Sequence, residues 1–229
     1  RYTSLTAFNA RYRQGMVTAT GSLIYTNITE RVKVGDAPAD FQRLAPSFTV
    51  SLQPWQEQLF FLRLMYKSTF RTPTFNDLYY YRLGNRSLRP EKANEYNIGI
   101  TWSKPFVSFL NYFSVTIDGY YNDVTDKIVA FPTTYAWKMA NYGKVRATGI
   151  DATLAAATSL SKNITLVISG GYTFQKAIDL TDPTSKSYKD QLPYTPEHSG
   201  NVSAILEMPW VNVGYSIVGV SERYSMSQN

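Results

Sequence analysis

The fold is decided by one stretch of the sequence, which reads Phe70-Arg71-Thr72-Pro73-Thr74-Phe75-Asn76-Asp77-Leu78-Tyr79-Tyr80-Tyr81 and, two residues later, Gly84-Asn85-Arg86-Ser87-Leu88-Arg89-Pro90-Glu91-Lys92-Ala93-Asn94-Glu95-Tyr96-Asn97-Ile98-Gly99. An alternating apolar segment leads into this stretch and another leads out of it. Alternation with a period of two predicts strands, and a proline cannot donate to a strand ladder. The stretch therefore predicts a strand, a long loop rich in aromatic residues and arginine, and a second strand.

The same alternation recurs along the whole chain and predicts about ten strands. They cover residues 3–13, 17–26, 48–52, 60–67, 95–102, 113–122, 150–154, 164–175, 201–207 and 213–222. No helical period of convincing length interrupts them. Many of these strands are longer than the five or six residues usual in a soluble sheet, and a tilted strand needs about 9–11 residues to cross a membrane.

The predicted connections alternate between short and long. Short turns fall near residues 14–15, 54–57, 103–105, 160–163 and 208–210, whereas long polar segments cover 30–43, 71–93, 124–145 and 176–199. Outer-membrane barrels have tight turns on the periplasmic side and large loops outside. A soluble sandwich has no reason to sort its loops in this way, so the pattern favours a membrane barrel.

Composition excludes several kinds of site. The 229 residues contain no cysteine, so disulfides and thiolate sites are excluded, and His198 is the single histidine. Charged residues make up 17% and aromatic residues 15%, and no apolar run is long enough for a transmembrane helix. The net charge is +6, and lysine and arginine are scattered along the chain, with the richest cluster, Arg82, Arg86, Arg89 and Lys92, in the long loop, so we do not expect nucleic-acid binding.

Alternation alone does not say which face of the sheet points outward. One face is apolar, and it could fill the core of a soluble sandwich or contact lipid. Trp55, Trp102 and Trp210 lie beside short turns, whereas the other aromatic residues of the predicted bands lie toward the long loops: Tyr66, Phe70, Tyr120, Tyr121, Tyr172 and Phe174. Two aromatic girdles would have this distribution, although tyrosine and tryptophan are also common in ordinary strands.

The opening stretch resembles the strand-loop-strand signature of the TonB-dependent outer-membrane receptors, which read F-R-x-P-T-x-N-[DE]-L-Y and then G-N-x-x-L-x-P-E-K. Two further segments are similar to the family in order and spacing. They are Asn141-Tyr142-Gly143 leading to Gly149-Ile150-Asp151, and Tyr172-Thr173-Phe174 followed by Leu192-Pro193-Tyr194-Thr195-Pro196-Glu197-His198. The resemblance covers essentially the whole chain.

This resemblance implies an all-β, antiparallel, up-and-down transmembrane β-barrel segment, with about ten strands of a larger, 22-strand barrel. Residues 1–229 would form part of one barrel domain, and the plug domain and the final strands would lie outside this chain. The implied function is the import of a scarce nutrient, such as a ferric siderophore, haem or cobalamin, with energy supplied by TonB. The implied location is the outer membrane of a bacterium.

The resemblance also implies a set of partners. They are the TonB complex acting through the plug domain, the nutrient ligand, the lipid bilayer and a surface lipoprotein. No cofactor and no catalytic activity are expected. Two alternatives stay open, a passive porin-like barrel and a soluble β-sandwich binding module. A membrane-barrel enzyme would need a histidine with serine or aspartate in its site, which a single loop histidine serves poorly.

Candidate ligand-binding residues lie in the long loop of the opening stretch: Arg71, Asn76, Asp77, Tyr79, Tyr80, Tyr81, Arg82 and Arg86. Arg71 could contribute to ligand capture or could only fix the loop through an ion pair with Asp77. The three consecutive tyrosines could form an aromatic platform for a large ligand or could pack the loop onto the barrel rim.

Charged residues inside the predicted strands are expected to face the lumen, where they would contact the plug or water: Arg63, Lys67, Glu95, Asp118, Asp151 and Glu207. His198 is expected to be structural, because metal sites need several ligands. Asp179, Asp182 and Asp190 share one loop and could bind Ca²⁺, but their spacing matches no EF-hand.

Overall fold

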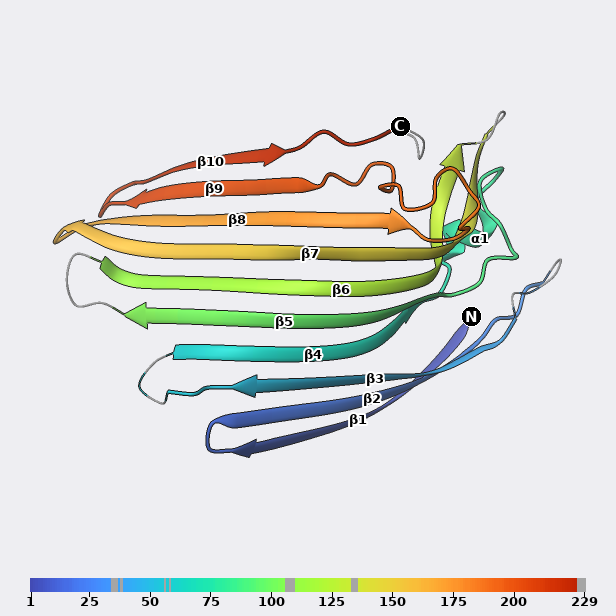
Figure 1. Ribbon diagram of the computed structural model, residues 1–229, viewed down its shortest axis with the longest axis horizontal. Helices are drawn as coiled ribbons and strands as arrows, with labels where there is room; N and C mark the ends of the chain where they lie inside the picture. Colours follow the sequence, from blue (N-terminus) through green and yellow to red (C-terminus); the bar gives the residue numbers. More distant parts are fainter. Residues whose placement is uncertain are drawn as a thin grey trace.

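The chain forms one antiparallel sheet of ten strands in simple sequential order (Figure 1). The computed structural model describes residues 1–33, 37, 39–55, 57, 59–105, 110–132 and 136–225. The strands are β1 (Tyr2–Gln14), β2 (Val17–Thr29), β3 (Phe41–Leu52), β4 (Leu59–Arg71), β5 (Glu91–Pro105), β6 (Leu110–Pro132), β7 (Trp137–Ser161), β8 (Ile164–Asp179), β9 (His198–Glu207) and β10 (Asn212–Val220). The prediction of an all-β, up-and-down meander is confirmed.

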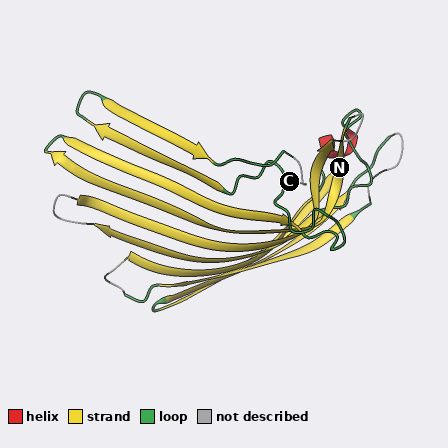
Figure 2. Cartoon of the chain, turned by 45° about the horizontal axis from the view of Figure 1, so that its top comes forward, coloured by secondary structure: helices red, strands yellow, loops and turns green. Residues whose placement is uncertain are grey.

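The two ends of the sheet differ, as the loop lengths predicted. Short turns join β1 to β2, β7 to β8 and β9 to β10 at one end, and the longer connections gather at the other end with the short helix α1 (Phe75–Tyr79) (Figures 1 and 2). Within the described residues β1 and β10 are the two edges of the sheet. No helix among the described residues has the length and apolarity needed to cross a membrane.

Two predicted connections are wrong. Residues 124–145 were expected to form a long loop, but β6 continues to Pro132 and β7 starts at Trp137, so most of this segment is an extended hairpin. A turn was expected at 103–105, but β5 runs through Pro105, and residues 106–109 lie outside the described part of the chain. Both segments continue as strands because β5 pairs with β6 as far as Pro105 and Tyr112, and β6 pairs with β7 as far as Pro132 and Trp137.

The extended hairpin at the ends of β6 and β7 bends away from the rest of the sheet (Figure 1). Pairing of β5 with β6 ends at Lys92 and Thr125, immediately before Asp126, whose φ of 56° lies in the left-handed region. Aspartate tolerates that region better than most residues. The bend directs the far part of the hairpin over the loop between β4 and β5.

Register places apolar and polar residues on opposite faces of the sheet. Leu64, Ile98 and Ile150 share one face with Tyr96, and each of these four side chains is exposed. The predicted lumen residues share the other face. Loops cover that polar face near its long-loop end, where Leu192 packs on buried Val124, Val145 and Ala177. An apolar face left open and a polar face covered by loops fit a barrel wall with lipid outside.

One ion pair spans three strands on the polar face. Arg63 on β4 contacts Asp118 on β6 at 3.1 Å, and Gly99 of β5 lies between them. A Cβ atom at Gly99 would collide with the Asp118 carboxylate. Glycine therefore leaves the space in which the two charged side chains meet across the intervening strand.

Aromatic rings form contacts across neighbouring strands on the apolar face. Toward the long loops, the ring of Tyr96 lies 5.2 Å from that of Tyr66 and 6.1 Å from that of Tyr121. Toward the short turns, Trp102 lies 5.5 Å from Phe113. Tyr120, which was predicted to belong to the aromatic girdle near the long loops, does not, because it points to the opposite face and covers Gly149.

Candidate functional site

The loop between β4 and β5 is built around α1, the single helix of the described residues. Thr74 caps the helix, and its Oγ1 accepts from the Asp77 backbone N–H at 3.2 Å. The Asp77 carboxylate accepts in return from the Thr74 N–H at 2.9 Å. This reciprocal capping box satisfies two free donors of a helix start and gives a five-residue helix a defined beginning. Alternation in the sequence did not predict this helix.

Arg71 ties four parts of the structure together. Its guanidinium lies 3.4 Å from Asp77 of α1 and 3.4 Å from Glu91 at the start of β5. It also donates to the Ile128 carbonyl of the extended hairpin at 3.1 Å, and Glu91 accepts from the Ile128 N–H at 3.1 Å. The expected Arg71–Asp77 pair is therefore present, within a network that holds the base of the loop.

The second half of the loop is fastened to β7 of the hairpin. The Asn141 side-chain amide donates to the carbonyls of Arg89 at 2.9 Å and Asp126 at 2.7 Å, and its Oδ1 accepts from the Arg89 N–H at 2.9 Å. The Arg89 guanidinium also contacts the Asp126 carboxylate at 2.5 Å. Closer to the loop tip, the Met139 N–H donates to the Leu83 carbonyl at 2.9 Å.

A small apolar core lies beneath the loop. Leu78 of α1, Leu88 of the β4–β5 loop and Ile128 of the hairpin are buried together, with Tyr79 and Met139 packed against them. Close packing extends to the backbone, since a Cβ atom at Gly84 would lie 2.7 Å from the Leu78 carbonyl oxygen. The loop is thus a packed unit and not an extended excursion, which fixes the positions of the side chains that it exposes.

The exposed side of this loop carries tyrosine and arginine. Tyr80 and Tyr81 are 59% and 79% exposed, and the Arg82 guanidinium lies over the Tyr81 ring at 5.2 Å. Arg86, also exposed, lies over the Tyr79 ring at 5.3 Å. Such stacking restrains a flexible guanidinium while leaving its donors open to a ligand. We call Tyr80, Tyr81, Arg82 and Arg86 the loop-tip surface.

Tyr79 faces the sheet and not the solvent. Its hydroxyl donates to Glu30, beyond the end of β2, at 3.1 Å. Burial, followed by this hydrogen bond, raises the pKa of Tyr79 above its usual value. The hydroxyl therefore keeps its proton at neutral pH and serves as a donor. Of the three tyrosines proposed as a platform, Tyr79 packs the loop onto the barrel rim and the other two are exposed.

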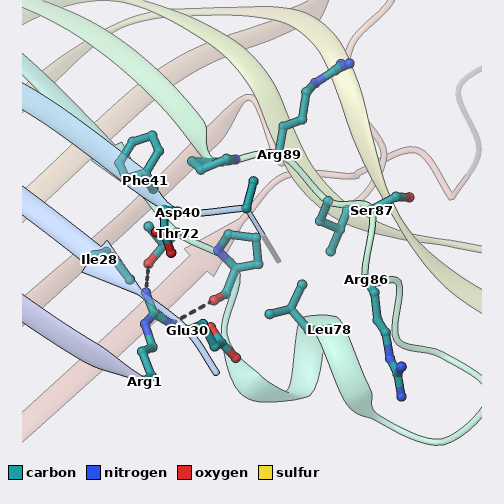
Figure 3. Close-up of a pocket in the computed structure, with 14 residues that line it drawn as sticks. Arg1, Ile28, Glu30, Asp40, Phe41, Thr72, Leu78, Arg86, Ser87 and Arg89 are labelled. Carbon is teal, nitrogen blue, oxygen red and sulfur yellow. Dashed lines mark hydrogen bonds between the residues drawn. The ribbon is translucent and has the colours of Figure 1, made fainter. Parts of the chain in front are cut away.

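A cavity of about 280 Å³ lies between the loop and the ends of β2 and β3. Leu78 points into it, whereas Arg86 and Arg89 extend away from it in opposite directions (Figure 3). Arg1 reaches across and donates to the Pro73 carbonyl at 3.1 Å and to the Thr72 hydroxyl. The residues that line the cavity are Arg1, Ile28, Glu30, Ala39, Asp40, Phe41, Thr72, Pro73, Leu78, Arg86, Ser87, Leu88, Arg89 and Pro90.

The structure divides the predicted site residues into groups. Arg71 and Asp77 hold the loop base, Tyr79 joins the loop to Glu30, and the loop-tip surface holds four others. Asn76 is exposed on α1, and its carbonyl accepts from the helix-ending Tyr80 N–H at 3.1 Å. Of the eight, Arg86 alone is among the residues that line the cavity within the described part of the chain.

Sequence reasoning did not identify Glu30, Phe41 or Arg89 as lining residues of this cavity, although Arg89 lies in the opening stretch. No local signal marks Glu30. Asn141 carried a signal, because it opens one of the segments that resemble the receptor family, but that resemblance did not reveal its role as a clamp. Long-range contacts of this kind depend on the bend of the hairpin.

The loop between β8 and β9 folds onto the polar face, where Leu192 packs on the strands. The described residues contain no cluster of three or more histidine, cysteine or acidic side chains suited to an ion. Asp179 is buried and accepts from the Thr181 N–H at 2.8 Å, while hydrogen bonds from Thr184 lower the pKa of Asp182. His198 lies on the apolar face, where its Nδ1 meets the Tyr172 hydroxyl at 2.7 Å.

Two curated relatives match part of the chain. The vitamin B12 transporter BtuB of Vibrio vulnificus is 36% identical over 84 residues, which are 36% of this chain and 13% of that protein. The protein of the same name from Photobacterium profundum is 29% identical over 97 residues, 40% of this chain and 15% of its own length. The chain therefore aligns with less than a sixth of either relative.

Solved structures share the fold at low identity. The copper transporter OprC superposes with a TM-score of 0.73 at 14% identity, covering 99% of this chain and 35% of OprC. The siderophore receptor PirA from Pseudomonas aeruginosa gives a TM-score of 0.60 at 16% identity, covering 95% of this chain and 38% of PirA. These likenesses establish that the ten-strand sheet is a barrel wall.

A family model supplies the assignment that these partial alignments do not. The model described as the TonB dependent receptor-like β-barrel matches residues 3–229, nearly the whole chain. The chain belongs to the β-barrel family of the TonB-dependent receptors.

Proposed function

We propose that this chain is the ligand-facing part of an outer-membrane receptor that imports a scarce nutrient with energy supplied by TonB. Family membership supports a receptor or transporter and not an enzyme. The long loops would lie outside the cell, and a plug domain elsewhere in the protein would couple to TonB. Outer-membrane location and TonB coupling are both parts of this proposal.

The loop-tip surface is the observation that carries the proposal. It presents two exposed tyrosine rings and two guanidinium groups on a loop whose base is fixed by the Arg71 network and by Asn141. A preorganised loop loses little conformational entropy when a ligand binds. Aromatic faces suit large flat ligands, and arginine suits carboxylate, phosphate and other anionic groups.

We assign the ligand to the class of ferric siderophores and cobalamins. Both are large and combine apolar or aromatic surface with anionic or polar groups, which matches the loop-tip surface. The vitamin B12 transporters that align with part of this chain support the cobalamin arm, and the siderophore receptor PirA shares its fold. Haem is a further candidate, because its porphyrin plane and propionates have the same two features.

The test is uptake by whole cells that express the full-length receptor. Radiolabelled cobalamin, a ferric catecholate and haem are supplied separately, in the presence and absence of TonB. One of them is expected to enter only when TonB is present, and an Arg82→Ala/Arg86→Ala variant is expected to bind it at least tenfold more weakly, at about 1 kcal/mol or more per lost charge-assisted contact. Entry that is proportional to concentration and indifferent to TonB would instead establish a passive porin.

A further inference from the structure

A band of cationic side chains lies on the outward, apolar face of strands β5 to β8. Register places Lys92 beside Thr125 and Thr125 beside Lys144, and it places Arg146 beside Asp123. Lys176 follows on β8, opposite Thr148. Because side chains alternate between faces, these residues point to the same side as Tyr96 and Tyr121. We call Lys92, Lys144, Arg146 and Lys176 the cationic band.

The band keeps an excess of positive charge. Asp123 is the acidic residue among them, and it lies 3.5 Å from Arg146 and 3.9 Å from Lys144. Arg146 also lies over the Tyr121 ring at 5.1 Å, which holds it at the level of the aromatic girdle. Lys92 and Lys176 are exposed. Four cations against one carboxylate form a surface suited to an anionic group.

An apolar groove begins next to the cationic band on the same face, on the side toward the middle of the strands. It encloses about 790 Å³, and its lining includes Tyr96, Ile98, Gly119, Ile150 and Phe174. Gly119 opens the groove, since an outward-facing position without a side chain lies there between bulkier neighbours. A Cβ atom added at Gly119 would find its nearest neighbour, Ile98 Cγ2, at 3.6 Å, so the space is real and a larger residue would fit.

We propose that the cationic band and this groove together bind a phosphate-bearing lipid of the outer leaflet, with its phosphate on the lysines and an acyl chain in the groove. The inference rests on the proposed outer-membrane location. From Arg146 to Ile150 is four residues along β7, which corresponds to roughly 13 Å at 3.3 Å per residue. This separation suits a headgroup and the upper half of one acyl chain.

The order of chemistry along the face favours a lipid over other occupants. Charge, aromatic rings and aliphatic side chains follow one another from the long-loop end toward the middle of the strands, as headgroup, interface and hydrocarbon do in a bilayer. A free anion would use the lysines but leave the groove unused. Basic clusters near a membrane surface gain about 1 kcal/mol per lysine or arginine from anionic lipid.

The test is native mass spectrometry of the delipidated full-length receptor in a neutral detergent. The probe is dioleoyl phosphatidic acid, compared with dioleoylglycerol, which has the same chains and no phosphate, and with inorganic phosphate as competitor. Variants are Lys144→Gln/Lys176→Gln and Gly119→Leu. The matched control, Lys67→Gln/Lys186→Gln, makes the same charge change on the polar face and in a loop. Heat-modifiability on gels checks that each variant is folded.

Phosphatidic acid is expected to bind stoichiometrically, and dioleoylglycerol at least tenfold more weakly. The double lysine variant should lose affinity by roughly 30-fold, following about 1 kcal/mol per lysine. Gly119→Leu should weaken binding at least fivefold, and the control less than twofold. Equal binding of dioleoylglycerol would overturn the proposal. The proposal would also be overturned if Gly119→Leu bound phosphatidic acid with unchanged affinity and inorganic phosphate displaced the lipid, because that result describes an anion site without a groove.

The outcome is separable from that of the proposed function. Nutrient uptake is measured on the same variants in cells. If the wild-type receptor imports its nutrient but binds no phosphatidic acid, the lipid site alone is overturned. Stoichiometric lipid binding in a receptor that imports nothing with TonB would leave the lipid site standing and remove the import function.

Discussion

Replacing Asn141 with alanine should release the second half of the β4–β5 loop from the extended hairpin. The Asn141 side chain makes three hydrogen bonds, two to Arg89 and one to the Asp126 carbonyl, at 2.7–2.9 Å. A hydrogen bond contributes about 0.5–1.5 kcal/mol net, and the freed atoms near the surface regain water. We therefore expect a total loss of about 2 kcal/mol, or roughly thirtyfold in the ratio of docked to released loop.

Limited trypsin digestion measures this ratio, because Arg82 and Arg86 lie in the loop and cleavage after either of them requires a locally opened segment. Where opening is fast relative to cleavage, the cleavage rate follows the open population, so it should rise about thirtyfold. Asn111→Ala is the matched control, since Asn111 makes a side-chain hydrogen bond to Ser159 at the opposite end of the sheet. A rate within twofold of wild type in Asn141→Ala, or an equal rise in the control, would refute the clamp.

Three further predictions follow from the same contacts. Gly99→Ala should weaken the Arg63–Asp118 ion pair and lower stability by about 1 kcal/mol or less, seen as a slightly lower heat-modification temperature, because the new Cβ displaces the partly exposed Asp118 carboxylate; a raised temperature would contradict this. Arg71→Gln should increase trypsin cleavage of the loop without changing that temperature by more than a few degrees, since its ion pairs are partly exposed; a global loss of stability would disagree. Glu30→Gln should lower the pKa of Tyr79 toward its usual value without reaching it, because burial is the larger cause of the shift. Since the pKa is raised in the folded state, the contribution of Tyr79 to stability is complete below the usual pKa and is lost as pH rises through the folded pKa. The pKa is measured by a tyrosinate difference titration against Tyr79→Phe, and an unmoved pKa in Glu30→Gln would contradict the role of Glu30.

Strand number, strand order and the two faces were predictable because alternation is local. Each apolar residue at i and i+2 reports its own face, and a meander pairs consecutive strands. The residues along Leu64, Ile98 and Ile150 were placed correctly on one face in this way. The extended hairpin was not predicted, because its two strands pair with each other beyond the sheet, and Ile128 and Met139 pack on the β4–β5 loop, a long-range contact that local alternation does not encode.

The candidate site was predicted only in part, for a related reason. The ion pair of Arg71 with Asp77 was one of the two alternatives that the sequence offered, and Glu91 joins it as the cross-strand neighbour of Arg71, but the contact with the Ile128 carbonyl required the bend at Asp126. The tyrosine run was identified as a unit, yet the short helix divides it, with Tyr79 turned toward Glu30 and Tyr80 and Tyr81 toward solvent. Side-chain direction in a loop depends on tertiary contacts that alternation does not encode.

The most direct test of the central claim is the accessibility of the loop-tip surface in living cells. A cysteine is placed at Tyr81, in a receptor without other reactive thiols, and a membrane-impermeant maleimide is added. A cysteine at Lys162, in a short turn at the opposite end, is the control. Tyr81→Cys should react in intact cells and become protected when the transported nutrient is added, while Lys162→Cys should react only after the outer membrane is permeabilised. Labelling of Lys162→Cys in intact cells, or no protection of Tyr81→Cys by any nutrient that the receptor imports, would contradict an external ligand-binding loop.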